Sequence, residues 1–161
     1  MRRANREITD PSRFQSILDQ SNICQLALID GDYPYVLPLN FGYDYQEGML
    51  TLYFHCAREG KKLDCIKKHN SAAFSVVGES RMVAGPLPCN CTMAYGSVMG
   101  QGKIEIIEGE GERLHAMKRL MDHCGWKGET PFNPQSLAAV CLLRLRAESV
   151  TGKHNDPKAQ P

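Results

Sequence analysis

The sequence has no long run of apolar residues and almost no net charge. No stretch approaches the roughly 18–20 apolar residues that cross a bilayer, so we expect no membrane span. The formal net charge of +1 on 161 residues argues against a broad nucleic-acid surface, which usually needs a clear excess of Lys and Arg. The basic start, Met1–Glu7, leads into no apolar signal region. We therefore expect a cytoplasmic protein.

Several common nucleotide and nucleophile motifs are also missing. No Gly-x-Gly-x-x-Gly follows a strand-like segment, and no Walker-type loop is present. The glycine-rich stretch Gly96–Gly102 lies among strand-like residues with no helix directly after it, which counts against a Rossmann fold. No Gly-x-Ser-x-Gly elbow stands between a strand and a helix, and no carboxylate pair has a spacing that indicates acid–base catalysis.

Cysteine, by contrast, is frequent. The seven cysteines are odd in number and mostly lie inside apolar patterns, which favours reduced thiols over a disulfide framework. Cys89 and Cys91 are the only close pair, and their one-residue spacing differs from the usual two-to-four-residue zinc knuckle. We expect thiols in a loop there, and no metal.

The residue pattern predicts a single domain over residues 1–153, with a polar tail over 154–161. Helices are expected after Asp10-Pro11, around 61–69 and over 112–124, the last with an inward stripe of Leu114, Met117, Met121 and Cys124. Strands are expected over 23–29, 35–43, 49–55, 72–77, 94–107 and 138–150, of which 94–107 is either one long strand or a bent pair. Loops are expected over 79–91 and 125–136. About six strands with few helices indicate a mainly β fold, a small barrel flanked by helices.

The expected strand 35–43 has two different faces. Its odd-numbered residues are large and apolar, whereas Val36, Pro38, Asn40 and Gly42 are small or polar. Pro38 cannot donate a ladder hydrogen bond, so it indicates a sheet edge or a bulge. The free backbone groups of Leu37 and Leu39 could then bind a planar ligand, or Pro38 could simply protect an edge strand from aggregation.

The segment Leu52–Leu63 predicts a strand that ends at His55 and a helix that opens at Gly60-Lys61-Lys62. Lysines and unpaired N–H groups at a helix N-terminus form a favourable anion site, to which a nearby histidine could add. The alternative is a strand–turn–helix with solvated lysines.

Three segments, Tyr35–Tyr43, Leu52–Asp64 and Tyr95–Gly102, occur in the order and spacing of a known family. In these segments the chain resembles the nitroimidazole-resistance (Nim) proteins, within the pyridoxamine 5′-phosphate oxidase-like, FMN-binding split barrels. The resemblance extends from about Arg2 to Lys153. It implies a six-stranded split barrel of Greek-key type, in a homodimer that binds FMN in a cleft at each end of the subunit interface.

The resemblance also implies cofactor contacts by position. The strand Leu37, Pro38, Leu39, Asn40 would hydrogen-bond the isoalloxazine edge, and Gly60, Lys61 and Lys62 would hold the phosphate. His55, Cys56 and Ala57 would line the ribityl and ring region, with His55 on the side where substrate enters. Ser97, or its strand neighbours, would contact the ring from the next strand. The candidates for contributions from the partner chain are the loop around Cys91–Tyr95, which includes Tyr95, and Trp126.

The function that the resemblance implies is reduction of small electrophilic or nitro-aromatic compounds, with NADH or NADPH as a possible donor and His55 as the candidate catalytic residue. Near the C-terminus the chain lacks the arginine and histidine signature that would grip pyridoxine phosphate, so that oxidase activity is not expected. A flavin or haem carrier, or a sensor without turnover, is the alternative, because a fold does not fix a function.

Overall fold

A computed structural model describes residues 4–128 and 133–157 of the chain. Residues 129–132 of the expected loop and 158–161 of the expected tail lie outside the described residues. The helices are α1 (Pro11–Asp19), α2 (Lys61–Lys68), α3 (Glu110–His123) and α4 (Pro134–Ala139), with short 3-10 turns η1 (Ala4–Arg6) and η2 (Pro88–Asn90). The strands are β1 (Glu7–Ile8), β2 (Ile23–Asp30), β3 (Tyr33–Asn40), β4 (Gly42–Gln46), β5 (Met49–Cys56), β6 (Ser71–Val83), β7 (Thr92–Ile106) and β8 (Cys141–Asn155).

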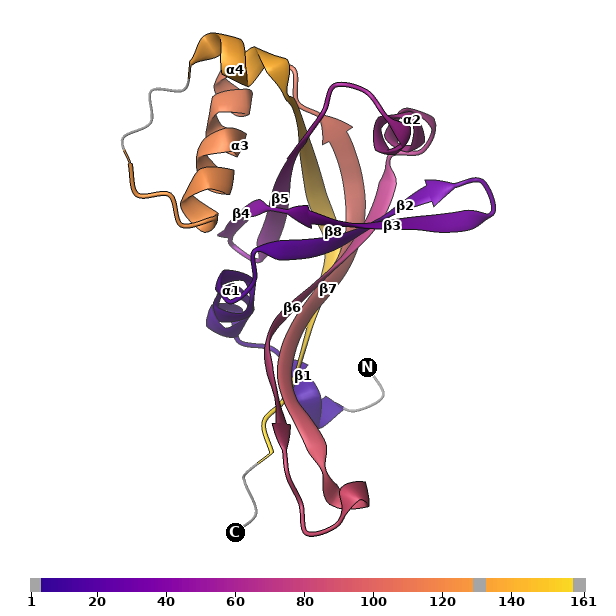
Figure 1. The fold of residues 1–161 in the computed structure, drawn as a ribbon, viewed down its shortest axis with the longest axis vertical. Helices are drawn as coiled ribbons and strands as arrows, with labels where there is room; N and C mark the ends of the chain where they lie inside the picture. The colour runs from indigo at the N-terminus through magenta and orange to yellow at the C-terminus, as the bar shows by residue number, and fades with distance from the viewer. Residues whose placement is uncertain (1–3, 129–132, 158–161) are drawn as a thin grey trace.

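The strands form one antiparallel sheet in the order β3-β2-β6-β7-β8-β5-β4, with β1 paired to β8. The sheet curls around one core, and its two edges, β3 and β4, follow one another in the chain but do not pair (Figure 1). We call the gap between β3 on one side and β4 with the end of β5 on the other the open seam. The predicted mainly β split barrel is confirmed, with eight strands rather than six.

Phe41 causes part of the difference in strand number. The alternation predicted for 35–43 is confirmed, since Leu37, Phe41 and Tyr43 are buried in the barrel core. The prediction of a single strand over 35–43 is wrong, because β3 ends at Asn40 and β4 begins at Gly42 on the other side of the seam. Gly42 lies against the backbone of α3, where a side chain would collide with Arg119 and Leu120.

Helix α3 covers the outer side of β4 and β5 (Figure 1). Leu50, Leu52 and Phe54 face the barrel core. Tyr53, on the opposite face of β5, is also buried, because it packs against α3 in a second, smaller core. The inward stripe predicted for α3 is wrong: Ala116 and Leu120 are the buried residues. In that stripe Met117 and Met121 are half-buried, whereas Leu114 and Cys124 are exposed.

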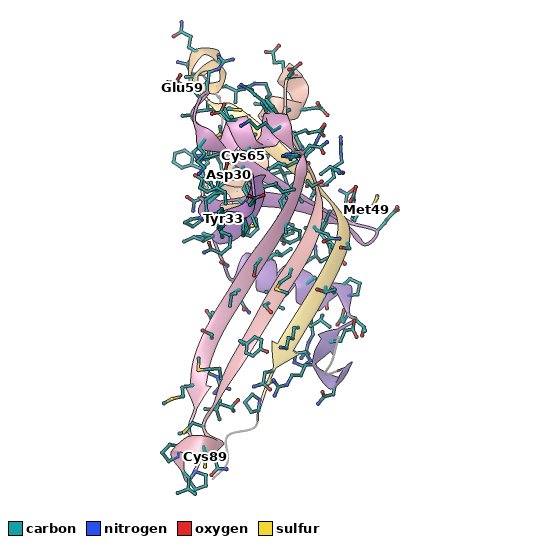
Figure 2. The ribbon with its side chains drawn as sticks, turned by 90° about the vertical axis from the view of Figure 1, so that its right-hand side faces the viewer. Asp30, Tyr33, Met49, Glu59, Cys65 and Cys89 are labelled. Carbon is teal, nitrogen blue, oxygen red and sulfur yellow. The ribbon has the colours of Figure 1, made fainter. Side chains whose placement is uncertain are left out.

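Strands β6, β7 and β8 extend beyond the barrel as a long arm (Figure 2). The predicted loop 79–91 is therefore shorter than expected, since β6 continues to Val83 and the connection to β7 at Thr92 spans residues 84–91. Cys89 lies at the tip of the arm (Figure 2). Strand β8 pairs along this arm as far as Asn155, two residues into the expected tail. Long pairing partners, rather than local propensity, extend these strands.

Candidate functional site

The open seam brings Asn40 and His55 together. Extending the β4–β5 register, in which Gly42 pairs with Tyr53, by two residues would put Asn40 opposite His55. The ladder is broken there, and both residues line a hollow of about 320 Å³ between the seam and helices α3 and α4. The rest of its lining is largely apolar and includes Met117, Met121 and Leu137.

His55 is exposed and lies on the α3-facing side of β5, two residues beyond the buried Tyr53. Among the described residues, no side chain forms a hydrogen bond with its ring. The side-chain amide of Asn40 donates a hydrogen bond of 2.9 Å to the carbonyl oxygen of Asn22, which fixes the amide and leaves its own oxygen available. The two polar groups at this end of the hollow are therefore free to bind a ligand.

The N-terminus of α2 lies directly after β5 in the chain. Gly60 is its N-cap residue, with a φ of +123° that favours glycine, and no side chain caps the helix. Leu63 and Asp64 donate their N–H groups to the Gly60 carbonyl oxygen at 2.9 and 3.3 Å. The uncapped first turn gives this end of α2 the partial positive charge that favours an anion.

The two lysines of this turn differ. Lys61 Nζ lies 2.6 Å from Asp30 Oδ2, on β2 beside α2 (Figure 2), and 4.9 Å from the centre of the Tyr35 ring. This hydrogen bond raises the pKa of Lys61 and lowers that of Asp30. Lys62 is half-buried and is close enough to Cys56 for its charge to act on the thiol. Of the two lysines, Lys61 already has a carboxylate partner.

Cys56 faces the inside of the barrel, opposite to His55. It packs against the barrel core and pairs with Cys141 of β8. Burial raises the pKa of the Cys56 thiol to about 11, although the charge of Lys62 acts in the other direction. Cys56 is therefore a neutral thiol near pH 7 and not an activated nucleophile.

The outer side of β2, β3, β6 and β7 carries no charged side chain between the Ser71–Lys103 pair at one end and the Val77–Ser97 pair at the other. Cross-strand pairs Gln25–Ser75, Val77–Ser97 and Ser75–Met99 share this side, and Ile23, Val36, Val77 and Met99 are each about half exposed or more. We call it the uncharged face; its residues are Ile23, Gln25, Ala27, Val36, Pro38, Ala73, Ser75, Val77, Ser97, Met99 and Gln101. Two predicted cofactor residues, Pro38 and Ser97, belong to it.

Tyr95 is not brought to His55 within one chain. It pairs with Ser80 and Asn155 on the arm and lines a different hollow, of about 310 Å³, beside α1. A hydrogen bond with Lys153, whose Nζ lies 5.7 Å from the ring centre, lowers the pKa of Tyr95.

The remaining predicted residues have different surroundings. Trp126 follows α3 and is half exposed, and its backbone N–H donates to the Met121 carbonyl oxygen at 2.9 Å. Ala57 is exposed after β5, Leu37 is buried in the core, and Leu39 packs partly against it.

Sequence reasoning missed helix α4, which closes the hollow. Arg113 donates hydrogen bonds to the carbonyl oxygens of Leu137 and Val140 at 2.6 and 3.0 Å, and Arg58 donates to that of Ala138 at 2.7 Å. A start signal was present, because Asn133 caps the helix through the N–H of Gln135 and Pro134 follows the cap. The two arginines hold α4 near His55.

Within residues 4–128 and 133–157, no three His, Cys, Asp or Glu side chains gather as a metal group. In the same ranges, no helix is long and apolar enough to span a membrane. All seven cysteines lie in these ranges as free thiols.

Solved structures share this architecture. A candidate 5-nitroimidazole antibiotic resistance protein from Bacteroides thetaiotaomicron VPI-5482 is 29% identical, with a TM-score of 0.79 over 92% of this chain and 86% of that one. A FAD and heme binding protein from Mycobacterium smegmatis is 20% identical, with a TM-score of 0.81 over 97% of this chain and 76% of that one. The flavocytochrome Anf3 from Azotobacter vinelandii is also 20% identical, with a TM-score of 0.78 over 100% and 74%. At 20% identity, the last two matches show similarity of fold only.

No curated protein matches this chain closely enough to count as a relative. The family model described as pyridoxamine 5′-phosphate oxidase matches residues 10–154. The match extends from the N-cap of α1 to the last residue but one of β8 and includes both sides of the open seam. This chain therefore belongs to the pyridoxamine 5′-phosphate oxidase family.

Proposed function

We propose that this protein binds FMN at the open seam and reduces small electrophilic or nitro-aromatic compounds there. The observation that carries the proposal is the meeting of His55 and Asn40 at a break in the barrel, directly before an uncapped helix N-terminus. The relative named as a candidate 5-nitroimidazole resistance protein supports the choice of acceptor.

The residues present fit the chemistry of FMN. A phosphate suits the N-terminus of α2, where the Gly60 backbone and the Lys62 ammonium supply donors and positive charge. A planar polar ring suits the outer edge of β3, because an edge strand has backbone groups without a strand partner. When bound, reduced FMN supplies a hydride to an acceptor.

The chain itself orients the acceptor and excludes water. His55 is the candidate catalytic residue, since its imidazole can hydrogen-bond a polar group of the acceptor or supply a proton to it. Asn40, held by its bond to Asn22, offers its amide oxygen beside it. Lys61 has a structural task in this arrangement, because its ion pair with Asp30 fastens α2 to β2.

We further propose that the protein is a homodimer through the uncharged face. Exposed apolar patches of this kind are typical of interfaces between protein chains. The partner's arm would then supply Tyr95 and its neighbours to the seam that they do not reach within one chain, and Trp126 is a second candidate for such a contact.

A visible absorption spectrum of the purified protein tests the cofactor. We expect flavin bands, their bleaching by NADH or NADPH under anaerobic conditions, and their return when 4-nitrobenzyl alcohol is added as the nitro compound. The His55→Ala variant should retain the flavin bands and lose most of the reoxidation rate. A colourless protein that takes up no added FMN would overturn the proposal.

A carrier or sensor is the second candidate, favoured by the haem-binding proteins among the structures of the same fold. Two results would favour it over the reductase. One is a haem absorption band in place of flavin bands. The other is a yellow protein that no nicotinamide donor or dithionite can make turn over any nitro compound.

A further inference from the structure

We infer that the hollow between β5, α3 and α4 binds the electron acceptor, and that it selects neutral, flat and largely apolar molecules. That the ligand is an electron acceptor rests on the proposed function. The hollow itself is lined by residues that the family resemblance did not indicate, above all Met117, Met121 and Leu137.

The lining of the hollow carries no permanent charge among the described residues. None of its side chains is Asp, Glu, Lys or Arg. A charged ligand would therefore lose water without gaining a permanently charged partner in the lining, which disfavours its binding. A neutral ligand has no such cost, so the lining selects by charge.

The size and shape of the hollow set a second limit. Its volume of about 320 Å³ is at the small end of ligand sites, enough for one substituted ring. Met117 and Met121 are one helical turn apart on α3, and their thioethers make favourable contacts with ring edges. One end carries the polar pair His55 and Asn40. A ring with one polar substituent meets both requirements, with the substituent towards His55.

The walls of the hollow are fixed on both sides. Arg119 Nε of α3 lies 2.8 Å from Asp44 Oδ1 of β4 and also donates to the Tyr43 carbonyl oxygen. On the other side, Arg113 and Arg58 bind the carbonyl oxygens at the end of α4. Because both helices are tied down by charged hydrogen bonds, the hollow exists before the ligand arrives.

Nuclear magnetic resonance of the full-length protein labelled with ¹³C-methyl methionine tests the inference. Nitrobenzene is the neutral probe and 4-nitrobenzoate its charged counterpart. We expect nitrobenzene to shift the signals of Met117 and Met121 and to leave those of the exposed Met49 and Met82 unchanged. We expect 4-nitrobenzoate to bind at least tenfold more weakly. Equal affinities of the two probes, or shifts that spare Met117 and Met121, would overturn the inference.

Filling the hollow gives an independent check. Met121→Trp should weaken nitrobenzene binding at least tenfold, while Leu114→Trp, at an exposed site on the same helix outside the hollow, should change it less than twofold. Ser136→Trp, from the exposed α4 side of the lining, repeats the test if Met121→Trp does not fold. Undiminished binding in a folded filled variant contradicts the inference.

The two proposals fail separately. FMN titration of the same samples reports on the proposed function, and the methionine signals report on the hollow. A protein that binds nitrobenzene at Met117 and Met121 but no flavin would refute the proposed function alone. A protein that binds FMN but binds nitrobenzene and 4-nitrobenzoate equally well would refute only the selectivity of the hollow.

Discussion

Lys61 and Lys62 are neighbours in sequence but have different surroundings. Both are cationic residues at the start of α2, so the sequence alone predicts the same role for both. In the fold, Lys61 is exposed and held by Asp30, while Lys62 is half-buried on the side of Cys56. No local pattern encodes this difference, because Asp30 comes from β2, about thirty residues earlier. Of the two, Lys62 is the better candidate for the phosphate.

Replacing Lys62 by alanine should weaken FMN binding by about 1.5–3 kcal/mol, the scale of a charge-assisted hydrogen bond. Titration of the apoprotein with FMN, followed by flavin fluorescence, measures this loss. Lys61→Ala should cost less, because its ammonium already has a carboxylate partner. Lys67→Ala, exposed in the last turn of α2, is the matched control. Unchanged affinity in Lys62→Ala would refute the phosphate assignment.

The cysteines also differ by position. Burial raises the pKa of the Cys56 thiol to about 11 and that of Cys24 to about 12, whereas Cys89 is exposed at the tip of the arm. At pH 8 only about one Cys56 thiol in a thousand is then the reactive thiolate. A short pulse of iodoacetamide should label Cys89 well before Cys56 or Cys24, as read by peptide mass spectrometry. Equal labelling of Cys56 and Cys89 in the folded protein, with the urea-unfolded protein as reference, would contradict this.

At the scale of elements, Asp44 holds α3 onto the barrel. Its carboxylate lies 2.8 Å from Arg119 Nε and 2.7 Å from His115 Nε2, and it accepts a hydrogen bond of 2.9 Å from the Tyr53 hydroxyl. Burial alone would raise the pKa of Asp44, but the hydrogen bonds from His115 and Tyr53 and the charge of Arg119 hold it below the ordinary value. The position of α3, and with it one wall of the hollow, depends on this carboxylate.

Replacing Asp44 by alanine should lower the free energy of unfolding by about 1.5–3 kcal/mol, since it removes charged hydrogen bonds and leaves the buried Tyr53 hydroxyl without this partner. Urea unfolding measures the loss. Asp122→Ala, which breaks the exposed Lys118–Asp122 pair of α3, should cost about 0.5 kcal/mol or less.

The stabilisation by Asp44 should also depend on pH. Because folding lowers its pKa, the contribution is complete above the unfolded value of 3.8 and is lost as pH falls through the lower folded value. The difference in unfolding free energy between wild type and Asp44→Ala should therefore shrink as pH falls below about 4. If this difference in unfolding free energy instead grew below pH 4, folding would not lower the pKa of Asp44.

Particular elements also show what sequence could and could not predict. The start of α1 was predictable because Asp10 and Pro11 act within one turn, and Asp10 indeed accepts from the Ser12 N–H at 2.9 Å. The inward face of α3 was not, because the second core that it joins is built by Tyr53 and Leu142 from distant strands. The length of β6 was underestimated for the same reason, since its outer half is held by pairing with β7. Of the candidate site, His55 was predicted from the segment Leu52–Leu63 and Asn40 from the family resemblance, while α4 was overlooked.

At the scale of the whole molecule, the uncharged face is the surface on which the proposed dimer depends. Replacing Val77, half exposed at its centre, by glutamate should turn the dimer into a monomer at micromolar concentration, because an unpaired carboxylate would be buried in the interface. Sedimentation velocity measures the change, and FMN affinity should fall with it. Leu114→Glu, exposed on α3, is the control and should leave the mass unchanged. A dimeric Val77→Glu would show that this face is not the interface.

The connection between β3 and β4 is a single residue, Phe41, whose ring is completely buried in the core. A loop in that position could lengthen or swing, but a packed aromatic ring cannot do so without unfolding its surroundings. The ends of β3 and β4 that join at Phe41 are therefore held at a fixed spacing. Cofactor entering the open seam would associate in one concentration-dependent kinetic phase, with no slow conformational step before or after.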